Sequence, residues 1–349
     1  MIKVLVVEDS RVSQELLVHI LNSDSGIKVI GTANNGMEAI EFLEHNKPDL
    51  ITMDIVMPKM NGYEATKNIM STHPLPIVMI TSSWGHKEVE KIFRATEMGA
   101  LAVLGKPMGK GFPDYEVRSK EIVQTVKLMS EIKVMKRPYH PRKTRVTSVL
   151  RSKVKHKPQL GIELIAIGAS TGGPPALKTI LSHLPKDFAI PVLIVQHITS
   201  GFTSGMVDWL GQTTGFPIHI AVNEEHILPG HVYFAPDNLQ MGVNNSGRIA
   251  LSLDNPENGT RPAVSYLFRS VAKNFGKHAV GVLLTGMGKD GSKELKLMKE
   301  KGAITIAQDK ESSVVHGMPG EAIKLGAATH ILPPDYIAKM LITLKSKTI

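Results

Sequence analysis

Residues 164–175 read Leu-Ile-Ala-Ile-Gly-Ala-Ser-Thr-Gly-Gly-Pro-Pro, and this stretch indicates how the carboxyl-terminal half of the chain folds. The four apolar residues at its start, two of them β-branched, are typical of a buried strand. Pro174 and Pro175 suit the first turn of a helix, where a missing backbone N–H costs little. Glycines between the two segments favour a sharp turn. We therefore expect a strand–turn–helix corner with Ser170 at the turn.

Ser170 stands in the pattern Gly-x-Ser-x-Gly, which is typical of nucleophilic serines in hydrolases. Amides at the start of the following helix would favour developing negative charge. Phosphate-binding loops are also rich in glycine, and serine is a common helix cap, so the pattern alone does not establish catalysis. A serine nucleophile needs a base within hydrogen-bond reach and a third group that orients the base. The chain must therefore supply a histidine and an aspartate at neighbouring strand ends.

The composition is that of a globular protein with room for two domains. The chain has 349 residues, of which 42% are hydrophobic and 21% charged, and these are ordinary values for folded proteins. The absence of cysteine excludes disulfides, thiolate nucleophiles and cysteine zinc sites. No apolar run approaches the ~20 residues of a membrane span, and no signal peptide opens the chain. We therefore expect a cytoplasmic protein that does not insert into membranes.

The positive charge of the chain is concentrated in one segment. The net charge is +9, yet ten Lys and Arg residues and no acid lie within residues 132–162, so the remainder carries about −1. Prolines and the loss of helical periodicity in this segment predict a flexible linker. A nucleic-acid-binding arm is the alternative, and it is disfavoured because no helix-turn-helix or zinc pattern accompanies the charge. The predicted division is a domain at 1–120, a helix end and linker at 121–159, and a second domain at 160–349.

Residues 1–110 alternate predicted strands and helices five times, which favours a parallel sheet covered by helices on both faces. Polar residues follow the strands at their carboxyl ends, namely Glu8, Asp9, Asp54, Thr81 and Lys106. Because these ends share one edge of the sheet, the three carboxylates form an oxygen site suited to Mg²⁺. The lysine and the hydroxyl suit a phosphoryl group held on one carboxylate. A single strand-end aspartate is usually a cap or a turn residue, but the full set favours a functional site.

This first domain resembles a response-regulator receiver domain, which has a flavodoxin-like (βα)5 fold. The resemblance is carried by Val-Leu-Val-Val-Glu-Asp-Ser, Met-Asp-Ile-Val-Met-Pro-Lys-Met-Asn-Gly and Leu-Gly-Lys-Pro. It implies that Asp54 accepts phosphate from a histidine kinase. It also implies metal ligands at Glu8, Asp9 and Asp54, and phosphoryl contacts at Thr81 and Lys106. The chain departs from the usual pattern at Glu8, where aspartate is more usual, and at Val103, where many receivers carry a switch aromatic.

Two more residues follow buried strands in the second domain. A predicted strand at 190–195 leads into His197, and another at 280–284 leads into a glycine-rich turn that contains Asp290. In a parallel sheet these ends and the Ser170 corner share one edge. His197 can then take the proton of Ser170, and Asp290 can fix the histidine tautomer. A lone strand-end histidine is more often structural. The inference therefore rests on all three residue types at matching strand ends.

The second domain resembles the chemotaxis protein-glutamate methylesterase (CheB) family. The motifs are Ile-Gly-Ala-Ser-Thr-Gly-Gly, Gln-His-Ile-x-x-Gly-Phe-Thr and Leu-Leu-Thr-Gly-Met-Gly-Lys-Asp-Gly. A receiver followed by this catalytic domain is the architecture of the family, so the resemblance covers nearly the whole chain except the linker. For the second domain it implies a doubly wound, mainly parallel α/β fold. The site residues that it implies are the triad Ser170, His197 and Asp290, with Thr171 and the Met287 amide beside it. The chain departs at Ser265, where the family often has aspartate, and at His316, where an aromatic is common.

The resemblance implies hydrolysis of glutamate γ-methyl esters on methyl-accepting chemotaxis receptors, with release of methanol, and deamidation of particular receptor glutamines. It implies Mg²⁺ for phosphorylation of the receiver and no cofactor for ester hydrolysis. One alternative is a receiver-controlled serine hydrolase with another target. The other is a non-enzymatic regulator whose linker binds nucleic acid. The three triad residue types at matching strand ends favour an enzyme.

Overall fold

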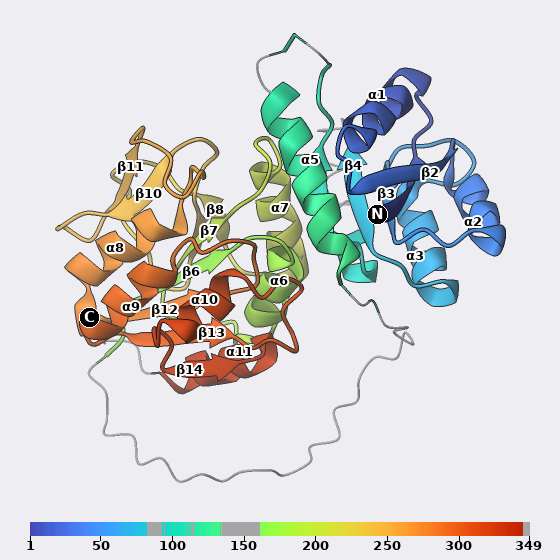
Figure 1. The fold of residues 1–349 in the computed structure, drawn as a ribbon. Helices are drawn as coiled ribbons and strands as arrows, with labels where there is room; N and C mark the ends of the chain where they lie inside the picture. The colour runs from blue at the N-terminus through green and yellow to red at the C-terminus, as the bar shows by residue number, and fades with distance from the viewer. Residues whose placement is uncertain are drawn as a thin grey trace.

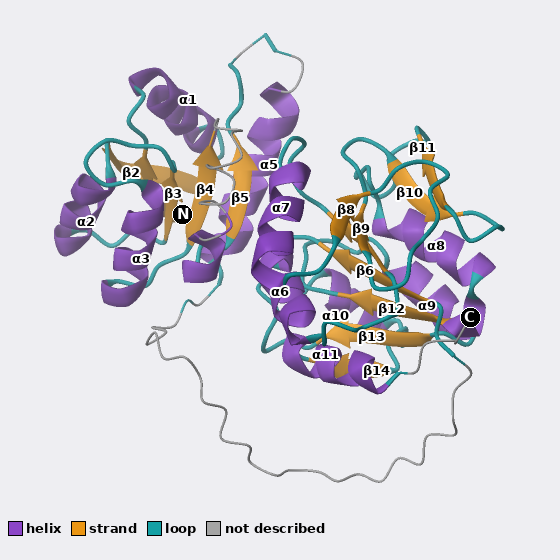
Figure 2. Cartoon of the chain, turned by 180° about the vertical axis from the view of Figure 1, so that it is seen from behind, coloured by secondary structure: helices purple, strands orange, loops and turns teal. Residues whose placement is uncertain are grey.

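The computed structural model describes residues 1–81, 93, 95–109, 111–112, 115–132, 134 and 161–344. Most of the predicted basic linker lies outside these residues. The described residues form two α/β units, each built on its own parallel sheet, as predicted (Figures 1 and 2). No described helix has the length and apolar character that crossing a bilayer would require.

The amino-terminal unit is a parallel sheet with the strand order β2-β1-β3-β4-β5 among the described residues. Its strands are β1 (Ile2–Val7), β2 (Ile27–Ala33), β3 (Leu50–Met53), β4 (Ile77–Thr81) and β5 (Ala102–Gly105). The accompanying helices are α1 (Arg11–Asn22), α2 (Gly36–His45), α3 (Gly62–Thr72) and α5 (Tyr115–Ser130). Side chains on α5 at helical spacing, Ile122, Val126 and Met129, are fully buried against the sheet. The helix continues past residue 120 into the range 121–159, where a helix end is expected before the linker.

The carboxyl-terminal unit is a parallel sheet with the order β14-β13-β12-β6-β7-β9-β8 within the described range. Its strands are β6 (Leu164–Ala169), β7 (Val192–Gln196), β8 (Ile218–Ile220), β9 (Val232–Phe234), β12 (Ala279–Leu283), β13 (Ile304–Gln308) and β14 (His330–Leu332). A separate antiparallel pair comprises β10 (Gln240–Val243) and β11 (Ile249–Ser252). From β6 the chain crosses to β7 on one side, and it returns with β12 on the other side. The strand order therefore reverses at β6, which is where α/β sheets form ligand crevices.

Helices cover both faces of this second sheet. They are α6 (Gly173–His183), α7 (Thr203–Thr214), α8 (Val264–Asn274), η1 (Gly276–His278), α9 (Ser292–Glu300), α10 (Met318–Lys324) and α11 (Pro334–Thr343). Alternate residues of β6 join different cores. Ile165 and Ile167 lie in the cluster that contains α6, α7 and α11 side chains, whereas Leu164 and Ala166 lie in the cluster with α8, α9 and α10. This two-sided burial explains why β6 reads as a continuous apolar run.

Candidate active site and receiver site

The Ser170 corner connects β6 to α6. The strand ends at Ala169, and the helix begins at Gly173 with proline in its first turn. Gly172 has a φ of +78°, a left-handed conformation that glycine adopts without steric cost. The Ser170 amide donates to the carbonyl of Thr285 (3.0 Å), which ties the corner to the loop after β12. Ser170 is therefore held at the carboxyl end of the central strand, partly exposed.

His197 and Asp290 lie at the ends of the strands on either side of β6. The His197 amide donates to the Ala169 carbonyl (2.9 Å), so the histidine lies beside the serine corner. The His197 Nε2 atom lies 2.9 Å from Oδ2 of Asp290. Among the described residues, neither His197 Nδ1 nor the Ser170 hydroxyl has a hydrogen-bond partner. Nδ1 is therefore the ring nitrogen left to accept a proton from Ser170.

Asp290 is 3% exposed and is held by several donors. Its Oδ2 accepts from the Val264 amide (2.7 Å), and its Oδ1 accepts from the Ser265 amide (3.1 Å) and from Asn258 Nδ2 (2.9 Å). Burial alone would raise the pKa of Asp290. The hydrogen bonds from His197, Ser265 and Val264 outweigh burial and lower the pKa from 3.8 to about 2. The carboxylate is thus ionised at neutral pH and suited to stabilise a protonated imidazole.

The loop after β12 brings backbone close to the serine. A Cβ at Gly286 would lie 2.7 Å from the Ser170 Cβ, so only glycine fits there. Met287, the next residue, is 42% exposed. The Thr285 hydroxyl donates to the carbonyl of Thr171 (2.9 Å), which ties the start of the Met287 loop to the residue after Ser170. This arrangement can present amides to a carbonyl oxygen under attack.

The receiver unit brings the predicted acidic residues together. One carboxylate oxygen from each of Glu8, Asp9 and Asp54 lies within 4.8 Å of the others. Lys106 Nζ lies 2.6 Å from Glu8 Oε2 and 2.7 Å from Asp54 Oδ2. Burial raises the pKa of Glu8, and the charge of Asp54 adds to this rise while Lys106 opposes it. Thr81 ends β4 at the same edge and is 1% exposed.

This donor set fits a hard divalent cation. Mg²⁺ in proteins is bound through carboxylate oxygens and water. Glu8 is fully buried, and apart from its ion pair with Lys106, its Oε2 has no hydrogen-bond partner in the described structure. Lys106 brings one positive charge to three clustered carboxylates, so a divalent cation would compensate the negative charge that remains. The cluster of Glu8, Asp9 and Asp54 is typical of a Mg²⁺ site in a receiver domain.

Comparison with known proteins gives a matching family for each of the two units. A family model described as CheB methylesterase matches residues 165–341, and one described as response regulator receiver domain matches residues 4–111. The chain belongs to the CheB methylesterase family. A relative from Nitrosospira multiformis is 55% identical, and the match covers 99% of this chain and 97% of the relative. Another, from Syntrophus aciditrophicus, is 53% identical with coverages of 99% and 98%. Both are named protein-glutamate methylesterase/protein-glutamine glutaminase.

A solved structure supports the fold of the catalytic half. The methylesterase catalytic domain of Thermotoga maritima CheB is 37% identical, with a TM-score of 0.51. The match covers 52% of this chain and 98% of the Thermotoga domain. The resemblance to CheB and the doubly wound, mainly parallel second domain are thereby confirmed.

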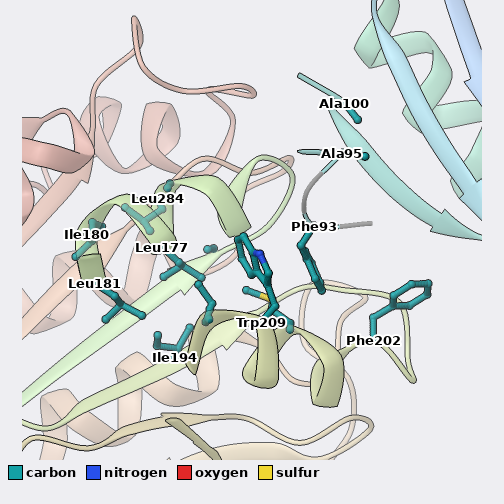
Figure 3. Close-up of a cluster of buried hydrophobic side chains, with 14 of the residues drawn as sticks. Phe93, Ala95, Ala100, Leu177, Ile180, Leu181, Ile194, Phe202, Trp209 and Leu284 are labelled. Carbon is teal, nitrogen blue, oxygen red and sulfur yellow. The ribbon is translucent and has the colours of Figure 1, made fainter. Parts of the chain in front are cut away.

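In this CheB chain the receiver packs against the catalytic domain through aromatic and charged side chains. Phe93 of the receiver stacks on Trp209 of α7, with ring centroids 5.0 Å apart and planes at 21° (Figure 3). Lys178 of α6 forms an ion pair with Glu97 of the receiver, and its Nζ lies 5.5 Å from the Trp209 ring centroid. Figures 1 and 2 place α5 of the receiver alongside α7. The contact therefore uses the edge of the receiver that includes Phe93, residues 95–105 and α5.

Two further contacts bring the receiver to the loops of the candidate triad. The Cγ2 methyl of Thr199, two residues after His197, lies 3.1 Å from the position that a Cβ on Gly105 would take. Val315 packs against the receiver core cluster, and its carbonyl accepts a hydrogen bond from the Gly286 amide (2.9 Å). The loop after His197 thus lies against the receiver, and the Met287 loop is hydrogen-bonded to Val315, which packs against the receiver.

Motifs indicated the three candidate catalytic residues, but the residues that surround Asp290 were not predicted. Asn258 and the amides at the start of α8 come from a loop without helical or strand periodicity. Asn258-Gly259, a turn dipeptide, is a local signal for a turn in that loop but not for a contact with Asp290. Ser265, noted as a departure from the family, contacts Asp290 through its amide. His316, the other departure, pairs with Gly286 through a parallel bridge, and burial lowers its pKa.

Proposed function

We propose that Ser170, His197 and Asp290 are the catalytic triad of this protein-glutamate methylesterase and protein-glutamine glutaminase. The 2.9 Å contact between His197 Nε2 and Asp290 Oδ2, beside the Ser170 corner at the strand-order switch, carries the proposal. The substrates are glutamate γ-methyl esters and particular glutamines on methyl-accepting chemotaxis receptors. The proposed division is a receiver domain at 1–120, a basic linker within 121–159 and a catalytic domain at 160–349.

The reaction proceeds by acyl transfer. His197 Nδ1 accepts the hydroxyl proton while Ser170 Oγ attacks the γ-carbonyl carbon, and Asp290 stabilises the imidazolium. The backbone amides of Thr171 and Met287 donate to the oxyanion. Collapse of the tetrahedral intermediate transfers the proton to the leaving methoxide, which departs as methanol. Water then hydrolyses the glutamyl ester on Ser170 by the same steps. With glutamine as substrate, ammonia leaves instead, and neither reaction needs a cofactor.

The receiver controls access to the triad. A chemotaxis histidine kinase transfers a phosphoryl group to Asp54, with Thr81 and Lys106 contacting the group. Glu8, Asp9 and Asp54 would hold Mg²⁺, which neutralises charge on the phosphoryl oxygens. The receiver contacts near Thr199 and Val315 restrict the triad in the unphosphorylated chain. Phosphorylation shifts the population toward an arrangement that frees this edge.

The decisive experiment measures methanol release from receptor-containing membranes that carry labelled methyl esters. Samples contain the full chain with or without Mg²⁺ and acetyl phosphate. Ser170→Ala should lower the rate at least about 10³-fold, because it removes the nucleophile. Ser246→Ala, on the exposed turn between β10 and β11, is the matched control and should leave the rate unchanged. Release that survives Ser170→Ala would refute the triad, and a folded wild type without release would move the target away from chemoreceptors.

A further inference from the structure

Gln196 is buried between the candidate nucleophile and the candidate base. It is the last residue of β7, is 6% exposed, and pairs in register with Ala169, the last residue of β6. Beyond this pair the two strands separate, because Ser170 turns into α6 and His197 leads into a loop. The hydrogen bond from the His197 amide to the Ala169 carbonyl is the last between the two strands (2.9 Å). Strand pairing alone therefore stops just short of both catalytic residues.

The side-chain amide of Gln196 replaces the missing strand pairing. Its Nε2 donates to the carbonyl of Ser170 (2.9 Å) and to the carbonyl of His197 (2.8 Å). One planar NH₂ group thus contacts the backbones of both residues and restricts their separation. These contacts determine which end of the carboxamide is the nitrogen. An oxygen at the position of Nε2 would lie against two carbonyl oxygens and could not donate to either.

The other end of the carboxamide shows that this arrangement has a cost. Gln196 Oε1 is buried and has no hydrogen-bond partner among the described residues. A Cβ on Gly173 would lie 2.0 Å from this oxygen, so the first residue of α6 must be glycine to accommodate it. An unsatisfied buried carbonyl typically costs about 1–3 kcal/mol. A buried polar group that is kept at such a cost calls for an explanation.

We propose that Gln196 is a positioning residue that sets the distance between Ser170 and His197 for attack on the ester. This inference rests on the proposed triad. Gln196 touches neither substrate nor the reacting atoms, and it acts through the backbone carbonyls of the two catalytic residues. Because misplacement of reacting groups by about 1 Å can cost about 10²-fold in rate, its removal should reduce kcat more than binding.

Two other buried glutamines hold the remaining loops of the site in the same way. Gln240 accepts from the Ala263 amide (2.8 Å) and donates to the Asn255 carbonyl (3.0 Å), which closes the loop that leads into α8, whose first amide donates to Asp290. Gln308 accepts from the Thr285 amide (2.8 Å) at the start of the Met287 loop. In the described part of the chain, the buried glutamines are Gln196, Gln240 and Gln308. Gln196 and Gln308 are the last residues of β7 and β13, and Gln240 is the first residue of β10.

The test replaces Gln196 with methionine, which has similar length but no donor. The matched control is Asn274→Leu, because Asn274 Nδ2 also donates to two backbone carbonyls, those of Val243 (2.9 Å) and Ser270 (3.0 Å). Asn274 lies at the end of α8, away from the triad. The full chain with Mg²⁺ and acetyl phosphate is assayed for kcat and KM of methanol release. The rate of Ser170 labelling by a fluorophosphonate and the thermal unfolding midpoint are measured on the same samples.

The expected result for Gln196→Met is a kcat about 10²-fold lower, a KM within threefold, and a labelling rate that falls in parallel. Asn274→Leu should keep kcat within threefold at a similar loss of thermal stability. The proposal is overturned if Gln196→Met keeps kcat within threefold of wild type, or if Asn274→Leu lowers kcat as much as Gln196→Met does. If the methionine variant does not fold, Gln196→Asn replaces it, because the shorter side chain of asparagine cannot reach both carbonyls. A wild-type kcat in Gln196→Asn would also overturn the proposal. A wild type that neither releases methanol nor labels at Ser170 would instead contradict the triad itself.

Discussion

The Oδ2 atom of Asp290 accepts a hydrogen bond of 2.7 Å from the backbone amide of Val264, the first residue of α8. The carboxylate therefore lies at the positive end of a helix dipole, which stabilises negative charge. Because Ala263, the cap residue, offers no side-chain cap, Asp290 also satisfies amides that the helix leaves unpaired. One carboxylate thus serves the fold through α8 and the proposed chemistry through His197.

This double role predicts a pH-dependent loss of stability. The pKa of Asp290 is lowered from 3.8 to about 2, so its ionised form stabilises the folded state above pH 4. The contribution is about 2 kcal/mol by linkage, and it is lost as the pH falls from about 4 to 2. Asp290→Asn should remove this part of the acid-induced loss, as measured by denaturant unfolding between pH 2 and 5. An unchanged slope over that interval would show that the carboxylate is not held in this way.

Asp290→Asn should also lower methanol release about 10⁴-fold, because the carboxamide neither stabilises the imidazolium nor favours the required tautomer. The measurement is kcat at pH 7, where the variant must first be shown to be folded by its circular dichroism. A rate within tenfold of wild type would contradict the role of Asp290 in the triad.

Asp54→Asn should keep the basal rate of methanol release and lose all stimulation by acetyl phosphate. The variant retains Glu8 and Lys106 but lacks the proposed phosphoryl acceptor, whose Oδ2 lies 2.7 Å from Lys106 Nζ. Chelation of Mg²⁺ by EDTA should have the same effect on the wild type, since the cation is needed only for phosphorylation. Stimulation that persists in the variant would refute Asp54 as the acceptor.

Local sequence was sufficient to predict the sheet and the strand ends, but not the contacts between distant segments. β6, β7 and β12 are continuous apolar runs that end in glycine or polar residues, so Ser170, His197 and Asp290 could be placed by position alone. The interactions of Asp290 with Asn258 and α8 depend on how a separate loop folds over the sheet. The spacing of apolar residues in the sequence does not predict the path of that loop. The contact between Phe93 and Trp209 could not be predicted for the same reason. In the sequence each looks like an ordinary core residue of its own domain, and the two meet only where the domains pack together.

The contact between Phe93 and Trp209 predicts how the receiver restrains the catalytic domain. Phe93→Ala removes the stacked ring and leaves Trp209, a core residue of α7, in place. An aromatic contact of this kind contributes about 0.5–1.5 kcal/mol, so the freed population should rise by roughly two- to tenfold. Basal methanol release without acetyl phosphate should increase accordingly, and the stimulation by acetyl phosphate should shrink. Phe112→Ala, at a receiver phenylalanine that is 50% exposed, is the control and should behave as wild type. Unchanged basal activity in folded Phe93→Ala would exclude this contact as the restraint.

The family often has aspartate at position 265, where this chain has serine. We expect Ser265 to be matched to Glu294, its hydrogen-bond acceptor. The Ser265 hydroxyl accepts from the Gly291 amide (3.0 Å) and donates to Glu294 Oε2 (2.7 Å). Ser265→Asp would keep the acceptor but lose the donor, and it would place a carboxylate against Glu294 and near Asp290. The free energy of unfolding should fall by about 1–3 kcal/mol, because two carboxylates would then face each other at a partly buried position and the hydrogen bond to Glu294 would be lost.

Glu294→Gln should restore most of this loss, since the introduced carboxamide can donate to the new carboxylate. A double-mutant cycle in urea should give a coupling of at least about 1 kcal/mol between the two positions, as expected for contacting residues. Ser270→Asp combined with Glu294→Gln is the control, because Ser270 bonds to Leu267 and Val243 instead of Glu294. Additive effects of Ser265→Asp and Glu294→Gln would mean that Glu294 is not the reason why this chain accommodates serine at position 265.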